Sequence, residues 1–314
     1  MSHRHLVDPE LLPVLEAFPS MELTVADLPG FRAQMDAMTA TIPQPALPVA
    51  VDEVMIAAAG APDVRALLFT PEARTSPAPA ILHIHGGAYI IGRPEISSAI
   101  LMETANALGC VILSVDYRLA PETPHPGPIE DCYAALGWLH MNAVRLGIDA
   151  ARIAVMGESA GGGLSAALAL LARDRGEYPI AFQLLDAPMM DDRTCARPPH
   201  PVAGEFVFTP KSNSFGWRCL LGQEPGSDGV SPYAAAARAE DLSGLPPAFV
   251  ATGALDLFLE ENLDYVRRLA RAAVPVELHV YPGAPHGYAL AHEAAITRTA
   301  TRDKLDALRR AFAR

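Results

Sequence analysis

The sequence RIAVMGESAGGG, residues 152–163, places a G-x-S-x-G pentapeptide between an apolar run and an Ala/Leu-rich stretch. The apolar run is typical of a buried strand and the later stretch of a helix, so Ser159 is expected at a tight strand-to-helix turn. Only small neighbours such as Gly157 and Gly161 fit around such a turn. The hydroxyl would project over the sheet at a helix N-terminus, where negative charge is stabilised. The pattern predicts a nucleophile; a glycine-rich helix-packing site is the alternative.

Beyond residue 50 the chain alternates short β-branched runs with longer Ala/Leu-rich stretches. This alternation of nearly continuous apolar strands with helices predicts an α/β fold, a mostly parallel central sheet flanked by helices. Strands are expected at 64–69, 80–85, 110–117, 152–157, 180–185, 247–253 and 276–281, and helices at 95–108, 128–146, 160–175, 259–273 and 291–313. Ligands of such folds bind at the carboxyl ends of the strands, so the chemistry is expected there.

Two segments depart from this alternation. Residues 1–50 contain two helical patterns, PELLPVLEAF and LPGFRAQMDAM, and end in a Pro-rich linker, TIPQPALPVA. Residues 187–225 are rich in Pro, Asp and Arg and are expected to form an excursion above the sheet. We therefore expect an N-terminal helical cap segment with its linker over 1–50 and a catalytic domain over 51–314, which includes the second excursion.

A serine becomes a good nucleophile only when a base takes its proton and an acid orients that base. His286 follows the apolar run VELHVY in the loop PGAPHGY, at the expected carboxyl end of a late strand. Asp256 follows the preceding strand, PAFVATG. Glu260 and Glu261, one turn into the next helix, are expected to be solvated or first-turn charges. The order Ser159, Asp256, His286 is the chain order of α/β-hydrolases.

The stretch ILHIHGGAYI, residues 81–90, has histidines at alternate positions and two adjacent glycines. His83 and His85 suggest a metal pair, but no third ligand stands at a suitable spacing, so no metal site is expected. Small residues let the backbone approach a substrate and turn its N–H groups inward, as an oxyanion hole requires. The loop HGGA is therefore predicted to supply oxyanion donors, together with the N–H of Ala160 after the nucleophile.

At these motifs the chain resembles the hormone-sensitive-lipase family of α/β-hydrolase esterases, a group that includes many bacterial carboxylesterases. The resemblance covers about residues 65–290 and rests on HGGAY (85–89), VDYRLAPE (115–122), GESAGG (157–162), SPYAAAARAEDLSGLPPAFV and HGY (286–288). It implies a central mixed sheet, a small helical cap made mainly from the N-terminal segment, and hydrolysis of short acyl esters without a cofactor.

The resemblance also implies a role for individual residues. The catalytic residues would be the nucleophile Ser159, the general base and acid His286, and its orienting carboxylate Asp256. The oxyanion hole would consist of the backbone N–H groups of Gly87, Ala88 and Ala160, and the motif would be supported by His85, Gly86 and Glu158.

The chain departs from the family's usual pattern at three positions. Ala88 stands where a third glycine is usual, and this change matters if the position needs a positive φ. Glu158 precedes the nucleophile, where aspartate is more common, and Leu257 follows Asp256, where proline is usual. The contribution of Ala88 therefore depends on its backbone geometry.

Other carboxylates of the sequence are candidates for acid/base groups. Asp116 and Asp131 lie in VDYRLAPE and PIED, which resemble structural loops of the family, so pairing with Arg118 or backbone capping is expected of them. Asp191 and Asp192 are adjacent and remain as further candidates.

The net charge of −12 argues against nucleic-acid partners and against anionic membrane surfaces. The four cysteines show no C-x-x-C spacing, which favours idle thiols in a reducing compartment. The N-terminus lacks the apolar region of a secretory signal, and no run approaches the length of about 18 apolar residues that a membrane helix needs. A cytoplasmic location is expected.

These observations together predict a serine carboxylesterase that hydrolyses short- to medium-chain acyl esters through an acyl-enzyme, without a cofactor. A lactone, amide or acetyl-group hydrolase would use the same triad and is the alternative. The second alternative is a ligand-binding receptor on this scaffold, as in the gibberellin receptors, which the family also resembles. Those receptors lack the triad histidine, whereas His286 is present here, so an enzyme is favoured. The expected partner is a small-molecule ester, and the sequence leaves a monomer and a homodimer open.

Overall fold

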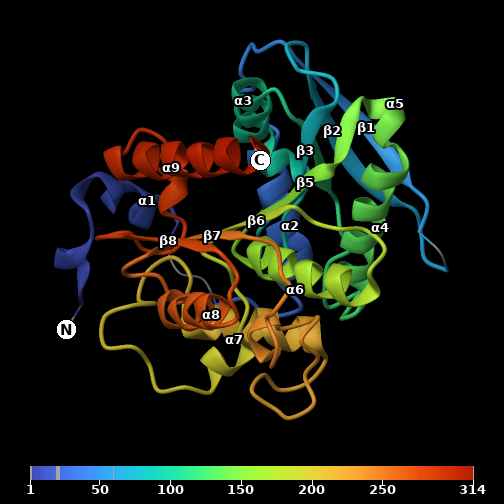
Figure 1. Cartoon of the computed structure of the whole chain (residues 1–314). Coiled ribbons are helices and arrows are strands. Elements are labelled where there is room, and N and C mark those ends of the chain that lie inside the picture. The colour runs from blue at the N-terminus through green and yellow to red at the C-terminus, as the bar shows by residue number, and fades with distance from the viewer. Residues whose placement is uncertain (1, 19–21, 59, 314) are drawn as a thin grey trace.

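The computed structural model describes residues 2–18, 22–58 and 60–313, and they build one central sheet between two helical layers (Figure 1). The strands are β1 (Val49–Ile56), β2 (Val64–Pro71), β3 (Ala78–Ile84), β4 (Val111–Val115), β5 (Ile148–Glu158), β6 (Phe182–Asp186), β7 (Ala248–Gly253) and β8 (Val276–Tyr281). Their order is β1-β2-β4-β3-β5-β6-β7-β8. The neighbours from β4 to β8 pair in parallel, whereas β2 pairs antiparallel with both β1 and β4. The predicted mostly parallel α/β sheet is confirmed.

All seven strands expected from the sequence are present, but β1 was not predicted. It begins at Val49, so the end of the expected linker belongs to the sheet. Only its two ends, Val49 and Ile56, are buried, because β1 is an edge strand with one neighbour. An edge strand that faces solvent carries no continuous apolar run, and the sequence VAVDEVMI therefore gave no strand signal.

The helices are α1 (Leu12–Ala17), α2 (Leu28–Thr39), α3 (Ser98–Leu108), α4 (Gly127–Met141), α5 (Ala143–Leu146), α6 (Ala160–Arg175), α7 (Pro210–Leu221), α8 (Leu259–Arg271) and α9 (Ala295–Phe312). Short 3-10 turns lie at η1 (Arg4–Leu6), η2 (Pro9–Leu11), η3 (Pro94–Ser97), η4 (Asp192–Cys195), η5 (Ala236–Arg238) and η6 (Tyr288–Leu290). Helices α3 and α9 cover one face of the sheet, and α4, α6 and α8 cover the other (Figure 1).

The expected helix over 128–146 is interrupted at Asn142. The side-chain amide of Asn142 donates to the carbonyl of Trp138 at 2.8 Å, and its backbone (φ −100°, ψ 9°) leaves the helical region. A side chain that bonds back to its own helix in this way competes with the backbone, so α4 ends and α5 begins as a separate turn.

The N-terminal residues attach to the layer formed by α9 and β8. The backbone N–H of Asp8 donates to the carbonyl of Gly283 at 3.0 Å, and the N–H of Ala295 donates to the Glu10 carboxylate at 2.6 Å. Leu11 is fully buried in the core on this face. The first helical turns of the chain therefore fix the start of α9.

Helices α2 and α7 both lie against the loop that follows β3. Arg32 of α2 donates to the carbonyls of Ile90 at 2.8 Å and Ala120 at 2.9 Å. Trp217 of α7 packs on the ring of Tyr89, with ring centroids 5.1 Å apart. Two segments that depart from the strand–helix alternation thus contact the stretch 85–91 from outside the sheet.

Candidate active site

The strand β5 ends at Glu158 and α6 begins at Ala160, so Ser159 alone makes the turn between them. Its backbone adopts φ 54° and ψ −121°, a conformation that residues other than glycine rarely occupy. A Cβ at Gly161 would lie 1.9 Å from the carbonyl oxygen of Ile84, so no larger residue fits beside the turn. The G-x-S-x-G pattern is therefore a packing requirement, and it holds the Ser159 side chain above the sheet.

Three predicted residues meet in a hydrogen-bonded series at the carboxyl ends of the strands. The imidazole Nε2 of His286 lies 3.0 Å from the Ser159 hydroxyl oxygen, and Nδ1 lies 2.8 Å from Asp256 Oδ2. The other carboxylate oxygen of Asp256 accepts from the backbone N–H of Phe258 at 2.8 Å. This bond fixes the fully buried carboxylate, so Leu257 in the position usual for proline does not displace it.

The surroundings of His286 favour its protonated form. Burial lowers the pKa of His286, but the adjacent charge and hydrogen bond of Asp256 raise it more, and Asp186 adds to the rise, so the pKa lies above its usual value. The rings of Phe258 and Phe208 lie 5.1 Å and 5.3 Å from the imidazole, centroid to centroid, and shield it from water. Hydrogen bonding to Asp256 retains a proton on Nδ1 and leaves Nε2 to accept one from Ser159.

The loop after β3 turns through three consecutive residues with positive φ: Gly87 (124°), Ala88 (53°) and Tyr89 (68°). A Cβ at Gly87 would lie 2.0 Å from the carbonyl oxygen of Ile91, so this position requires glycine. Position 88 does need a positive φ, and Ala88 adopts it at a cost that glycine would not have. No acceptor among the described residues takes a hydrogen bond from the N–H of Gly87 or Ala88.

The N–H of Ala160 belongs to the first residue of α6, so no carbonyl within the helix can accept its hydrogen bond. It stands directly after Ser159, on a helix N-terminus whose dipole favours negative charge. The structure thus leaves the three backbone N–H groups of Gly87, Ala88 and Ala160 without partners within the described chain.

Glu158 supports the loop from the neighbouring strand. Its carboxylate accepts from the backbone N–H of Gly86 at 3.1 Å and from the Ser97 hydroxyl at 3.2 Å, and it lies 3.0 Å from Nε2 of His83. Burial raises the pKa of Glu158, but the interaction with His83 and the donated hydrogen bonds outweigh it and lower the pKa to about 2. Glu158 is therefore charged at neutral pH and holds the start of the loop.

The two histidines of ILHIHGGAYI have separate structural partners. Nδ1 of His83 lies 2.8 Å from the Ser114 hydroxyl. Nδ1 of His85 lies 2.8 Å from the carbonyl oxygen of Gly86, and its ring stacks on Tyr117 with centroids 4.3 Å apart. In the part of the chain that the structure describes, no three His, Cys, Asp or Glu side chains are grouped as metal ligands would be. These contacts hold His85 against the start of the loop.

The other carboxylates named in the sequence analysis have structural partners, and two of the expectations about them need correction. Asp131 binds the Arg118 guanidinium at 2.6 Å, as expected, but Asp116 pairs with Arg65 at 3.0 Å and not with Arg118. Glu261 does lie in the first turn of α8, but the expectation that it is solvated is wrong, since its side chain is buried.

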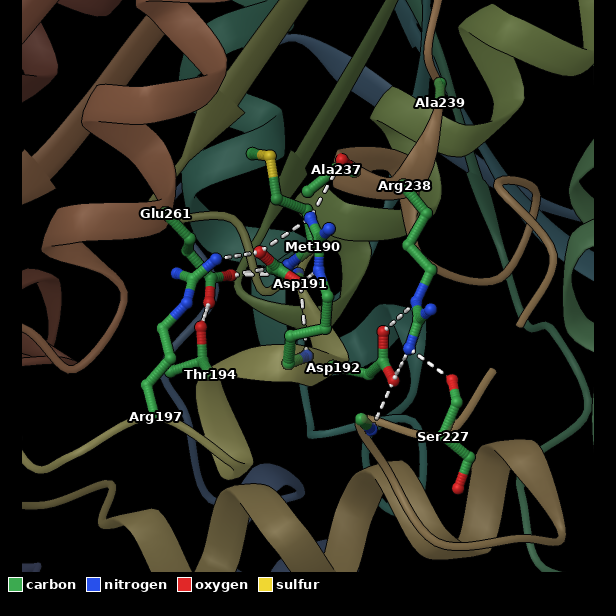
Figure 2. A network of polar contacts seen from close by, with 12 residues as sticks. Met190, Asp191, Asp192, Thr194, Arg197, Ser227, Ala237, Arg238, Ala239 and Glu261 are labelled. Carbon is green, nitrogen blue, oxygen red and sulfur yellow. Dashed lines mark hydrogen bonds and ion pairs between the residues drawn. The ribbon is translucent and has the colours of Figure 1, made fainter. Parts of the chain in front are cut away.

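Glu261 is at the centre of a buried polar network (Figure 2). Its carboxylate accepts from the backbone N–H groups of Met190 at 2.7 Å and Asp191 at 3.2 Å, and it also bonds the Thr194 hydroxyl. A signal for this burial is present in the sequence: Glu261 shares a helical stripe, at i+4 and i+8, with the buried residues Tyr265 and Leu269.

The adjacent acidic residues of this network are neutralised by arginines (Figure 2). Asp191 pairs with Arg193 and Arg197, each at 2.7 Å, and Asp192 pairs with Arg238 at 2.7 Å. Ion pairing explains both carboxylates, and neither contacts Ser159 or His286 through a hydrogen bond.

A cavity of about 330 Å³ opens beside the hydrogen-bonded series, and both Ser159 and His286 line it. Apolar side chains such as Ile100 of α3 and Leu305 of α9 form much of its wall. It also contains an ion pair that the sequence did not indicate, with Lys304 Nζ 2.6 Å from Asp186 Oδ2. The sequence does contain a feature that could have identified Asp186 as a residue of the site. It directly follows the predicted strand IAFQLL, and ligands of parallel sheets bind at that end of a strand.

A mostly parallel sheet with a serine at a strained strand-to-helix turn, bonded to a histidine and a buried aspartate, defines the class of α/β-hydrolases. Residues 81–290 match a protein-family model for the alpha/beta hydrolase fold. The chain belongs to this family, and the resemblance to the hormone-sensitive-lipase group is confirmed.

Proteins of known structure and sequence place the chain among esterases. The structure of a bacterial heroin esterase matches with a TM-score of 0.91 and 41% identity, over 99% of both chains. The esterase LipW from Mycobacterium marinum matches with a TM-score of 0.86 and 31% identity, over 99% of this chain and 98% of LipW. Carboxylesterase NlhH of Mycobacterium tuberculosis is 34% identical over 284 residues, which cover 90% of this chain and 88% of NlhH.

Proposed function

We propose that this protein hydrolyses short- to medium-chain carboxylic esters through an acyl-enzyme formed on Ser159. The relatives described above are esterases, and the chain is a carboxylic ester hydrolase. The observation that supports the mechanism best is the series of hydrogen bonds from Ser159 through His286 to the buried Asp256, at 3.0 Å and 2.8 Å.

In the proposed mechanism, the Ser159 hydroxyl attacks the ester carbonyl while Nε2 of His286 takes its proton. Asp256 holds the imidazole in the required tautomer and stabilises the imidazolium that forms. His286 then protonates the departing alcohol, and water repeats the two steps to release the acid. The distances in the structure allow the first proton transfer without rearrangement of the side chains.

Negative charge on the former carbonyl oxygen would be stabilised by the N–H groups of Gly87, Ala88 and Ala160. Donors fixed at such a position typically contribute about 3 kcal/mol each to the transition state. Their lack of partners within the described chain supports this role. Glu158 and His85 support it indirectly, since both bond to Gly86 at the start of the loop.

The preference for short to medium acyl chains rests on the size of the cavity. Its volume of about 330 Å³ is near the lower end of the roughly 300–1,000 Å³ that is common for ligand pockets. We expect acyl chains of about eight carbons or fewer to be cleaved fastest. The N-terminal segment before β1 and residues 187–225 are proposed to form the helical cap, supported by the contacts of α2 and α7 with the loop 85–91; residues 1 and 19–21 of the segment expected over 1–50 lie outside the described chain, and its last two residues belong to β1.

We also propose a cytoplasmic location and no nucleic-acid partner. All four cysteines are free thiols, as is typical of a reducing compartment, and the net charge is −12. No helix in the described ranges combines the length and apolarity needed to span a membrane. A homodimer stays a prediction, which sedimentation of the purified chain would test.

The test of the proposed function is hydrolysis of p-nitrophenyl butyrate by the purified protein and by Ser159→Ala. We expect Ser159→Ala to abolish turnover, and the control Ser243→Ala, at an exposed loop position, to retain it. A burst of p-nitrophenol equal to the enzyme concentration would identify the acyl-enzyme. Undiminished turnover in Ser159→Ala would exclude this nucleophile. Faster cleavage of lactones or amides than of any acyl ester would favour the alternative substrates.

A further inference from the structure

The cavity beside Ser159 contains a charged pair that the proposed triad does not use. Asp186, the last residue of β6, and Lys304, from α9, lie with carboxylate oxygen and ammonium nitrogen 2.6 Å apart. Their side chains are only 11% and 21% exposed. Both residues line a mainly apolar cavity, one from β6 and the other from α9, so the pair bridges the sheet and the α9 layer.

Stability does not account for such a pair. Removing two charges from water costs free energy that their attraction often fails to recover, and two apolar residues of similar volume stabilise a fold at least as well. What distinguishes this largely buried pair from the buried Asp192–Arg238 pair is its place in the apolar cavity that Ser159 and His286 line, and this place points to a role in binding or chemistry.

The pair is adjacent to the reacting groups. The backbone N–H of Ser159 donates to the carbonyl of Asp186 at 2.9 Å, so the two residues are hydrogen-bonded neighbours across β5 and β6. The hydroxyl of Tyr288, two residues after His286, lies 3.4 Å from the Asp186 carboxylate. Asp186, Lys304 and His286 line the same cavity.

The charged and titratable groups around His286 come from several elements. Asp256 contacts it from the loop after β7, and Ser159 contacts it from the turn after β5. Asp186 at the end of β6 and Tyr288 of η6 line the same cavity as His286. The rings of Phe208 and Phe258, which lie against the imidazole, carry no charge.

Elsewhere on the cavity wall, Glu158 and His83 bond to each other, and His292 is exposed near the opening. Burial lowers the pKa of His286, and the charge of Asp256 and then that of Asp186 raise it. Lys304 is the cation bonded to Asp186, so it offsets the second of these two charges.

We propose that Asp186 and Lys304 together set the proton affinity of His286. The Asp186 carboxylate stabilises the imidazolium that forms during acyl transfer, and the Lys304 ammonium limits this effect. Both are positioning residues that act through His286. The inference rests on the proposed function for its meaning in catalysis, but the titration of His286 can be measured without turnover.

The experiment compares wild type, Asp186→Asn, Lys304→Met and the double variant. Two readouts are used between pH 5 and 9: NMR titration of the His286 imidazole, and kcat/KM for p-nitrophenyl butyrate. Asp186→Asn keeps the shape of the side chain and leaves Lys304 unbalanced, so the His286 midpoint should fall by about half a unit to one unit. Lys304→Met should raise it by a similar amount, and the double variant should return close to wild type.

The matched control is Arg310→Gln. Arg310 is a cation on the same helix as Lys304, but it pairs with Glu277 of β8 and does not line the cavity beside Ser159. It should leave the midpoint unchanged. A folded Asp186→Asn protein whose His286 midpoint is unchanged or raised would overturn the inference, as would a fall in Lys304→Met. A wild-type protein inactive toward every ester would instead overturn the proposed function, and the NMR titration would still decide the inference.

Discussion

Two buried carboxylates follow the same strand, β7, and lie five residues apart, yet they have opposite surroundings. Asp256 is bonded to the imidazole of His286, a group that can take up positive charge. Glu261 accepts from two backbone N–H groups and a hydroxyl, which are all neutral (Figure 2). Burial alone therefore does not distinguish a catalytic carboxylate from a structural one, whereas the nature of the partner does.

The two carboxylates also differ in their protonation. Burial raises the pKa of Glu261 to about 8, because the donors from Met190 and Thr194 only partly offset the lost hydration and the charge of Asp191 adds to the rise. Glu261 is thus largely protonated at neutral pH. We expect changes at Asp256 to affect activity and changes at Glu261 to affect stability.

The largest expected effect is that of Asp256→Asn. The amide keeps the size of the side chain and can still accept from the N–H of Phe258, but it would donate to His286 and favour the wrong tautomer. By analogy with the Ser-His-Asp proteases, kcat should fall by roughly 10⁴-fold. Hydrolysis of p-nitrophenyl butyrate measures the effect on activity, and thermal unfolding measures the effect on stability.

The midpoint of thermal unfolding should change little in Asp256→Asn, because no cavity is created. If kcat stays within tenfold of wild type, Asp256 is not the orienting residue and the comparison with Glu261 fails. Asp264→Asn, at an exposed position on α8 that pairs with Arg267, is the control and should leave both quantities unchanged.

The next effect is that of Glu261→Leu on stability. This change leaves the buried N–H groups of Met190 and Asp191 without an acceptor, so the free energy of unfolding should fall by about 2–4 kcal/mol. The measurement is denaturant unfolding at pH 7. The matched control is Glu260→Ala, one residue earlier and exposed, which should change the free energy by less than about 0.5 kcal/mol.

The contribution of Glu261 to the free energy of unfolding should also depend on pH. Because the folded protein raises the pKa of Glu261 from 4.5 to about 8, its contribution is complete below pH 4.5 and declines as the pH rises toward 8. Glu261→Gln cannot ionise, so it should gain stability relative to wild type over this range, by at most about 1.4 kcal/mol per pH unit. A constant difference between the two proteins would show that folding does not raise the pKa of Glu261.

The same comparison shows what the sequence could and could not predict. Ser159, Asp256 and His286 each follow an apolar strand, and the architecture brings the carboxyl ends of parallel strands together, so their meeting was predictable. Glu261 was misjudged because its position near a helix N-terminus suggested a solvated charge, while its helical stripe indicated burial. The Asp186–Lys304 pair joins residues 118 positions apart, and no local pattern encodes such a contact.

The backbone conformation of Ala88 could not be predicted from the sequence either. The family pattern showed that a glycine was replaced, but whether the replacement mattered depended on φ, which only the folded loop defines. The value of 53° places Ala88 in the left-handed region, beside Gly87 at 124° and Tyr89 at 68°. The loop next to Ser159 therefore contains two strained residues other than glycine, Ala88 and Tyr89, whereas the network around Glu261 is fixed by hydrogen bonds and ion pairs.

The smallest expected effect tests this contrast. Ala88→Gly would relieve a left-handed conformation that costs an alanine about 1–2 kcal/mol, but the unfolded chain would gain about 0.4–1 kcal/mol of conformational freedom. The net gain in the free energy of unfolding should therefore be about 0.5 kcal/mol, measured by denaturant unfolding. Since the change keeps the N–H of residue 88 in place, kcat for p-nitrophenyl butyrate should stay within about twofold. A tenfold fall in kcat would mean that the methyl group of Ala88 itself positions the loop, and that the strain is part of how the site is held.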